Sequence, residues 1–182
     1  IFAERAVPIQ VNYLVYPGTM GANFIDYIIG DKDLIPGSDE VFYAEKVVCL
    51  PDSYQVNGAR RVKSANIPGR ADVGLPESGF VFCCFNSNYK ITPDVFDIWM
   101  RLLERVEGSV LWLLEGNAAA SRNLRLEAEA RGVRAERLGF APRMPPADHM
   151  ARQALADLFL DTLPCNAHTT ASDALWAGLP LL

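Results

Sequence analysis

Strand-like and helix-like segments alternate through the second half of this 182-residue sequence, and this alternation constrains the fold more than any other feature. Short runs of apolar residues predict buried strands at 80–85, 109–114, 137–140 and 156–160. Helical spacing and capping residues predict helices at 92–106, 118–131, 148–152 and 172–177. Repeated strand–helix units imply a parallel sheet with right-handed crossovers, so we expect an α/β fold.

The first half of the chain predicts shorter strands followed by a polar segment. β-Branched and aromatic residues predict strands at 10–16, 26–29 and 47–50, the first of them closed by Pro17-Gly18. From residue 52 to residue 78 the sequence is polar, contains several Gly and Pro residues and shows no period. This segment is therefore the natural linker, with a domain boundary near Pro76.

Composition excludes several classes of protein. Half of the residues are hydrophobic, which is typical of a globular protein, and the net charge of −5 argues against a nucleic-acid or anionic membrane partner. The apolar runs are far shorter than the ~20 residues of a membrane span. The cysteines at 49, 83, 84 and 165 form no CxxC pair, so we expect no metal site, but buried reduced thiols in a cytoplasmic protein.

A polar turn and a short helix follow the apolar strand that contains Leu158–Leu160. The first N–H groups of such a helix have no partner within it, and the helix dipole places partial positive charge there. His168, Thr169 and Thr170 therefore stand where a phosphate or diphosphate binds well. Asp173, one turn further on, is within reach of a sugar hydroxyl. Ordinary capping by the threonine hydroxyls is the alternative.

Two further candidates follow predicted strands, at the edge where parallel sheets bind ligands. Lys90 ends the polar loop after strand 80–85, where its charge could neutralise a phosphate, although most lysines are simply solvated. His149 follows strand 137–140 and could stack on a planar base, or be a plain surface histidine. No strand is followed by a GxGxxG motif, which argues against a Rossmann-type oxidoreductase.

Taken together, these segments resemble the catalytic region of protein O-linked N-acetylglucosamine transferases, a family that includes SPINDLY-like members. The resemblance covers nearly all of the sequence, in order. Its most specific stretch is Cys-Asn-Ala-His-Thr-Thr at 165–170, followed by Asp173 and Leu-Trp-Ala-Gly at 175–178. The other matching segments are 10–22, 26–29, 85–86, 89–90, 109–114 and 160–162.

The resemblance implies a GT-B fold, in which two Rossmann-like lobes bind a nucleotide-sugar. Residues 1–60 would be the C-terminal part of the first lobe, 61–76 a linker, and 77–182 a truncated second lobe that binds the donor. We therefore expect this sequence to be a piece of a longer chain that carries tetratricopeptide repeats and acts on protein acceptors. The piece alone should be inactive.

The resemblance also implies roles for individual residues. Lys90 would be catalytic, offsetting charge on the departing nucleotide, while His168, Thr169 and Thr170 hold the diphosphate. Asp173 would bind the ribose and His149 would stack on uracil. The remaining residues implied for the donor or its sugar pocket are Asn86, Tyr89, Met144 and Cys165, with Leu14, Pro17 and Gly18. The family needs no metal, so no cofactor is expected beyond the UDP-sugar substrate.

The activity implied is transfer of N-acetylglucosamine from UDP-N-acetylglucosamine to Ser or Thr hydroxyls of proteins. Two alternatives stay open: a different donor, GDP-fucose or UDP-glucose, and a non-catalytic nucleotide-binding module. Three departures from the animal enzymes support the second alternative: Ser87 replaces Gln, Pro146 replaces Lys, and Val15 replaces Gly. The linker is also too short for the large intervening domain of the animal enzymes, as is usual in bacterial relatives.

Overall fold

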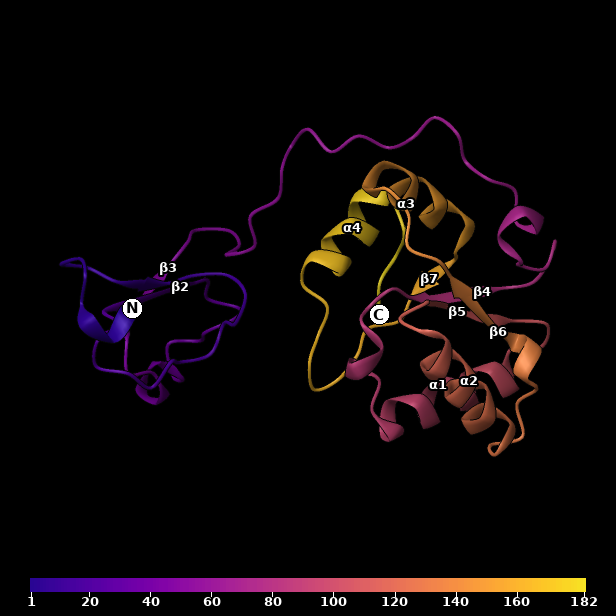
Figure 1. The fold of residues 1–182 in the computed structure, drawn as a ribbon, viewed down its shortest axis with the longest axis horizontal. Helices are drawn as coiled ribbons and strands as arrows, with labels where there is room; N and C mark the ends of the chain where they lie inside the picture. The colour runs from indigo at the N-terminus through magenta and orange to yellow at the C-terminus, as the bar shows by residue number, and fades with distance from the viewer. The chain divides into compact units, whose positions relative to one another are not determined.

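The computed structural model describes residues 1–182, and the chain divides into two compact units (Figure 1). The first unit is Ile1–Gly58 and the second is Ala59–Leu182. Residues 61–76, predicted as a linker, are thus counted with the second unit. Six short 3-10 helices complement the regular elements: η1 (Phe2–Glu4), η2 (Glu40–Phe42), η3 (Ala71–Val73), η4 (Asn88–Lys90), η5 (Ala135–Arg137) and η6 (Gln153–Leu155).

The second unit is built on a four-stranded parallel sheet. Its strands, in spatial order, are β6 (Leu138–Ala141), β5 (Val110–Leu114), β4 (Val81–Cys84) and β7 (Leu158–Phe159). A parallel bridge between Phe159 and Leu181 extends the sheet beyond β7. The four strands predicted from apolar runs are all present, and the predicted parallel α/β fold is confirmed.

Four α-helices cover the two faces of this sheet. In Figure 1, α1 (Pro93–Arg105) and α2 (Ala118–Glu129) lie on one face, and α3 (Pro146–Arg152) and α4 (Thr169–Ala177) on the other. The helix predicted from residue 172 begins three residues earlier, because Thr169 and Thr170 already have helical geometry. No helix in the structure has the length and apolar character needed to cross a membrane.

The core of the second unit lies between the sheet and its helices. All four residues of β4 are buried, and Trp112 of β5 and Phe159 of β7 are completely inaccessible. Helical spacing predicts an apolar face of Val95, Ile98, Trp99, Leu102 and Leu103 on α1, and this prediction is wrong at Ile98, which is 46% exposed. The buried face is rotated to include Phe96 and Met100 instead, since these side chains point at the sheet.

All four cysteines are free thiols, as predicted, but only two are buried. Cys83 and Cys84 lie within β4, and burial raises the pKa of Cys84 to about 12, so it is inert as a nucleophile at neutral pH. The expectation of burial is wrong for Cys49 and Cys165, which are exposed because each lies at or beyond the end of a strand.

The first unit contains a three-stranded parallel sheet of β1 (Val11–Asn12), β2 (Tyr27–Gly30) and β3 (Lys46–Cys49). The predicted strand 10–16 is wrong beyond Asn12. Leu14 and Val15 have φ angles of 61° and 39°, in the left-handed region, so the chain turns out of the sheet there. A β-branched residue rarely adopts this conformation, which makes Val15 a strained position.

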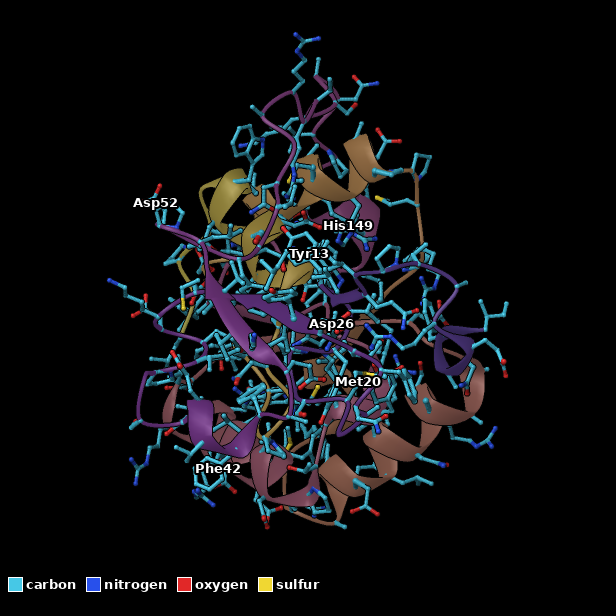
Figure 2. All side chains as sticks on the ribbon, turned by 90° about the vertical axis from the view of Figure 1, so that its left-hand side faces the viewer. Tyr13, Met20, Asp26, Phe42, Asp52 and His149 are labelled. Carbon is cyan, nitrogen blue, oxygen red and sulfur yellow. The ribbon has the colours of Figure 1, made fainter.

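Two carboxylates shape the loops of the first unit. Asp26 accepts a hydrogen bond from the Gln10 amide at 2.8 Å, and Glu45, 4% exposed, accepts bonds from the Thr19 hydroxyl and the Met20 amide, both at 2.6 Å. Burial disfavours ionisation of Glu45, but these hydrogen bonds outweigh it and lower its pKa. Asp26 and Met20 are labelled in Figure 2. The turn that follows β1 is therefore held by Glu45, which precedes β3.

Candidate functional site

The strand order of the second unit reverses at β4. The chain runs outward from β4 to β5 and β6, and then returns to form β7 on the other side of β4. In open parallel sheets, ligands bind beyond the carboxyl ends of the strands at such a reversal, because the two connections leave in opposite directions. Here the loop after β4 (residues 85–90) and the loop after β7 (residues 160–168) meet at that point.

Lys90 connects these two loops. It ends η4, and its Nζ donates a hydrogen bond to the carbonyl oxygen of Asn166 at 2.8 Å. Asn166 lies two residues before His168, the N-cap of α4. The structure therefore places the ammonium group beside the segment that leads into α4, and not on a remote surface.

The start of α4 lacks a side-chain cap. His168 makes no capping hydrogen bond, whereas the N-caps of α1 and α2, Thr92 and Asn117, each accept one from a backbone amide. The Thr170 hydroxyl donates instead to Oδ1 of Asn86 at 2.5 Å. Capping of α4 by a threonine hydroxyl, which was the alternative to an anion site, is therefore wrong. Its first N–H groups form a positive helix end at the sheet reversal.

Asp161, which the sequence did not single out, holds the loop before α4 in shape. Its Oδ1 accepts hydrogen bonds from the amides of Thr162 and Ala167, both at 2.7 Å, and from the Asn86 side chain at 3.2 Å. Its Oδ2 accepts one from the Asn166 side chain at 3.0 Å. Asp161 thus fixes the residue whose carbonyl oxygen binds Lys90. A carboxylate directly after a strand was the available signal.

His149 belongs to an aromatic and cationic cluster beside the end of β4. Its ring packs edge-on against Phe85, with 5.1 Å between the centroids, and it is labelled in Figure 2. Arg152, 1% exposed, lies over Phe85 and Trp112, 5.0 and 5.7 Å from their centroids. Its Nη1 donates to the carbonyl oxygen of Pro142 at 2.6 Å, while Nε and Nη2 have no hydrogen-bond partner. Burying these two N–H groups without hydrogen bonds costs free energy, and the cation–π contacts with the two rings compensate part of it.

His149 is uncharged at neutral pH. Burial, with a smaller effect of the Arg152 charge, lowers its pKa from 6.5 to about 4. A neutral imidazole stacks on an uncharged base without desolvating a charge. The environment of His149 therefore suits the stacking role that the sequence predicts, and that role stays a prediction.

Acid should destabilise the protein through His149. Between pH 6.5 and about 4 the unfolded chain binds a proton that the folded chain excludes, so the free energy of unfolding falls as the pH drops through that window. Allowing for solvent screening, the loss is about 1–2 kcal/mol. His149→Phe keeps a ring against Phe85 and cannot titrate. Thermal melts of both proteins from pH 7 to pH 4 should show a smaller loss in the variant; parallel losses would contradict this.

The other predicted site residues are distributed over both units. Tyr89 is 82% exposed, Cys165 and Thr169 are exposed, and Met144 is half-buried. Asp173 is paired with Arg61. Leu14, Pro17 and Gly18 all lie in the turn after β1 of the first unit, each half-buried. No group of three or more His, Cys, Asp or Glu side chains is arranged to hold a metal ion.

A separate cavity lies at the opposite end of the sheet. It has a volume of about 570 Å³ and is lined by residues at the amino-terminal end of β5, including Ser109 and Val110, and by Arg134 and Arg137. The Arg137 guanidinium donates hydrogen bonds there to the carbonyl oxygens of Leu103 and Ser109. The amino ends of parallel strands all lie at one edge of the sheet and the carboxyl ends at the other. This cavity is therefore distinct from the candidate site, which lies at the carboxyl ends of β4 and β7.

A parallel sheet covered by helices on both faces, with its strand order reversing at β4, defines the class of Rossmann-like α/β proteins. Within that class, the chain belongs to glycosyl transferase family 41, whose family model matches residues 1–65 and 55–182. It has the GT-B fold in its matched part: an O-GlcNAc transferase mutant from Thermobaculum terrenum superposes with a TM-score of 0.83 and 32% identity, covering 100% of this chain and 34% of that chain.

Curated relatives give the same family. A probable UDP-N-acetylglucosamine–peptide N-acetylglucosaminyltransferase, SEC, from Arabidopsis thaliana is 42% identical over 100% of this chain and 19% of its own length. The corresponding transferase of Caenorhabditis elegans is 40% identical over 65% of this chain and 10% of its own length. A SPINDLY protein of Petunia hybrida is 33% identical over 99% of this chain and 19% of its own length. The chain thus spans about a fifth or less of these relatives.

Proposed function

We propose that the protein containing this chain transfers N-acetylglucosamine from UDP-N-acetylglucosamine to Ser or Thr hydroxyls of proteins. The relatives from Arabidopsis and C. elegans, which are named as UDP-N-acetylglucosamine–peptide transferases, support this donor and a peptide acceptor. The observation that carries the proposal is the Lys90 ammonium, 2.8 Å from the Asn166 carbonyl oxygen, beside the uncapped start of α4. A cation and a helix N-terminus together suit a diphosphate.

Transfer breaks the bond between the sugar C1 and an oxygen of the β-phosphate, while the acceptor oxygen forms a bond to C1 and releases its hydroxyl proton to solvent. The electron pair of the broken bond leaves with the diphosphate, so negative charge grows there in the transition state. In this proposal Lys90 and the first amides of α4 stabilise that charge, since preorganised donors lower a barrier most where charge develops. The residues of this chain therefore promote departure of the nucleoside diphosphate.

The remaining residues take supporting roles in this proposal. His168, Thr169 and Thr170 hold the diphosphate, and Thr170 does so through its backbone amide, because its hydroxyl donates to Oδ1 of Asn86 at 2.5 Å. Asp173 accepts from the ribose, and His149 stacks on uracil. Tyr89, Met144 and Cys165 complete the donor site of the second unit.

We also propose that the reaction needs neither a metal nor another cofactor, because Lys90 and the α4 dipole supply positive charge where the diphosphate would bind. The protein partners are acceptor proteins, selected by tetratricopeptide repeats elsewhere in the complete chain. A cytoplasmic location is supported by the four free thiols, which are typical of reducing compartments.

A donor panel tests the proposal. The complete protein is incubated with a peptide library and UDP-N-acetylglucosamine, UDP-glucose or GDP-fucose, with and without EDTA, and transfer is followed by mass spectrometry. We expect transfer from UDP-N-acetylglucosamine, unaffected by EDTA. Preferred transfer from another donor would replace the proposed substrate. Calorimetric binding of UDP without transfer or donor hydrolysis would instead indicate a non-catalytic module.

A further inference from the structure

Residues 61–64, which the sequence identified only as part of a linker, are attached to two helices of the second unit. The Arg61 guanidinium forms an ion pair with the Asp173 carboxylate on α4. Lys63 Nζ donates to the carbonyl oxygen of Ala177 at 3.0 Å, at the C-terminal end of α4. The Ser64 amide donates to the Ala147 carbonyl oxygen of α3 at 3.0 Å. The segment therefore lies against the face of α4 that carries Asp173.

The Arg61–Asp173 pair is shielded from solvent on both sides. The two side chains are only 18% and 21% exposed. Burial raises the pKa of Asp173, while the charge and hydrogen bond of Arg61 oppose that rise. Because an ionised carboxylate is costly to bury without a partner, the Arg61 guanidinium favours the charged form of Asp173 and fixes its rotamer. Asp173 lies one turn along α4 from Thr169 and Thr170, the first residues of the helix.

We propose that Arg61 is a positioning residue, which holds Asp173 so that its second carboxylate oxygen accepts hydrogen bonds from the ribose hydroxyls of the nucleotide donor. This inference rests on the proposed function, since it takes the donor diphosphate to lie at the start of α4. Arg61 binds Oδ1 through Nη1. A carboxylate has about four lone-pair sites, so Oδ2 keeps acceptor capacity for a hydroxyl.

A purely structural role for Arg61 would have a different consequence. Lys63 and Ser64 attach the segment to α4 and α3 through bonds that do not involve Asp173. Removing the Arg61 side chain therefore leaves the segment attached at two other points. In Arg61→Ala, the preference for a ribose over a deoxyribose ligand should therefore fall more than the affinity for the nucleotide. A site built to bind a hydroxyl rejects the analogue that lacks it, provided its acceptor is held in place.

The test compares two ligands on the complete protein by calorimetry: UDP and 2′,3′-dideoxy-UDP. Wild-type protein should bind the dideoxy ligand about tenfold more weakly than UDP, the cost expected for losing charge-assisted hydrogen bonds. Arg61→Ala should weaken UDP binding several-fold and bring the ratio of the two dissociation constants close to about 1. Asp173→Ala should do the same, and Arg61→Lys should restore part of the ratio. Lys63→Ala, the matched control, should leave the ratio unchanged.

Three results would overturn the inference alone: an unchanged ratio in Arg61→Ala with both ligands weakened equally, no discrimination in wild-type protein that binds UDP, or full discrimination in Asp173→Ala. If Arg61→Ala does not fold, as judged by circular dichroism, the ratio in Arg61→Gln and Arg61→Lys decides the same question. Failure of the proposed function looks different, because it is measured as a lack of N-acetylglucosamine transfer by the wild-type protein and not as a ratio of dissociation constants in the variants.

Discussion

Replacing Lys90 with alanine should lower the kcat of sugar transfer by the complete protein about 10²–10³-fold. The ammonium group contacts the Asn166 carbonyl oxygen at the entry to α4, where we place the diphosphate. Charge on the diphosphate grows as the bond to the sugar breaks, so Lys90 stabilises the transition state more than the bound substrate. The loss should therefore appear mainly in kcat and only weakly in KM.

Steady-state kinetics of three variants separate this role from a general effect of charge. Lys90→Arg keeps a cation at the site and should retain part of the rate, although its planar group cannot reproduce the position of the ammonium. Arg101→Ala removes an exposed cation from α1 of the same unit and should leave kcat unchanged. A Lys90→Ala enzyme with wild-type kcat, or with a defect in KM alone, would show that Lys90 does not act on the leaving group.

The second unit was the predictable part of the fold. Its strands are buried on both faces, so they appear in the sequence as apolar runs, and Thr92-Pro93 marked the start of α1 correctly. The first unit was harder because its strands are short and carry few buried residues. β1 ends at Asn12, and the left-handed turn at Leu14 and Val15 has no sequence signature, since neither residue favours that conformation.

The candidate site was predictable where topology alone brings residues together. Lys90 and the start of α4 follow strands β4 and β7, which are neighbours in a parallel sheet, and their carboxyl ends therefore meet. The pair of Arg61 and Asp173, separated by 112 positions, was not predictable, because nothing local marks where a polar segment returns to the fold. Asp161 was overlooked for a related reason: two of its four hydrogen-bond donors are backbone amides, which any residue type provides, and a third is the side chain of the distant Asn86.

Replacing Asp161 with alanine should both destabilise the second unit and abolish tight donor binding. Three donors in the loop, including the amides of Thr162 and Ala167, lose a charged acceptor, and this costs about 3 kcal/mol of unfolding free energy. The Asn166 side chain is released as well, so the carbonyl oxygen that holds Lys90 is no longer fixed. We expect UDP affinity to fall about 100-fold, which corresponds to roughly the same free energy.

Asp157 provides the matched control at the opposite end of β7. It accepts a hydrogen bond from the Val81 amide at 2.8 Å and one from Arg70 at 3.2 Å, so Asp157→Ala should also lower the free energy of unfolding, by about 2 kcal/mol. It lies at the amino end of the strand, and UDP affinity measured by calorimetry below the melting temperature should not change. If Asp157→Ala weakens UDP binding as much as Asp161→Ala does, lost stability explains both, because the two carboxylates share a strand but not the donor site.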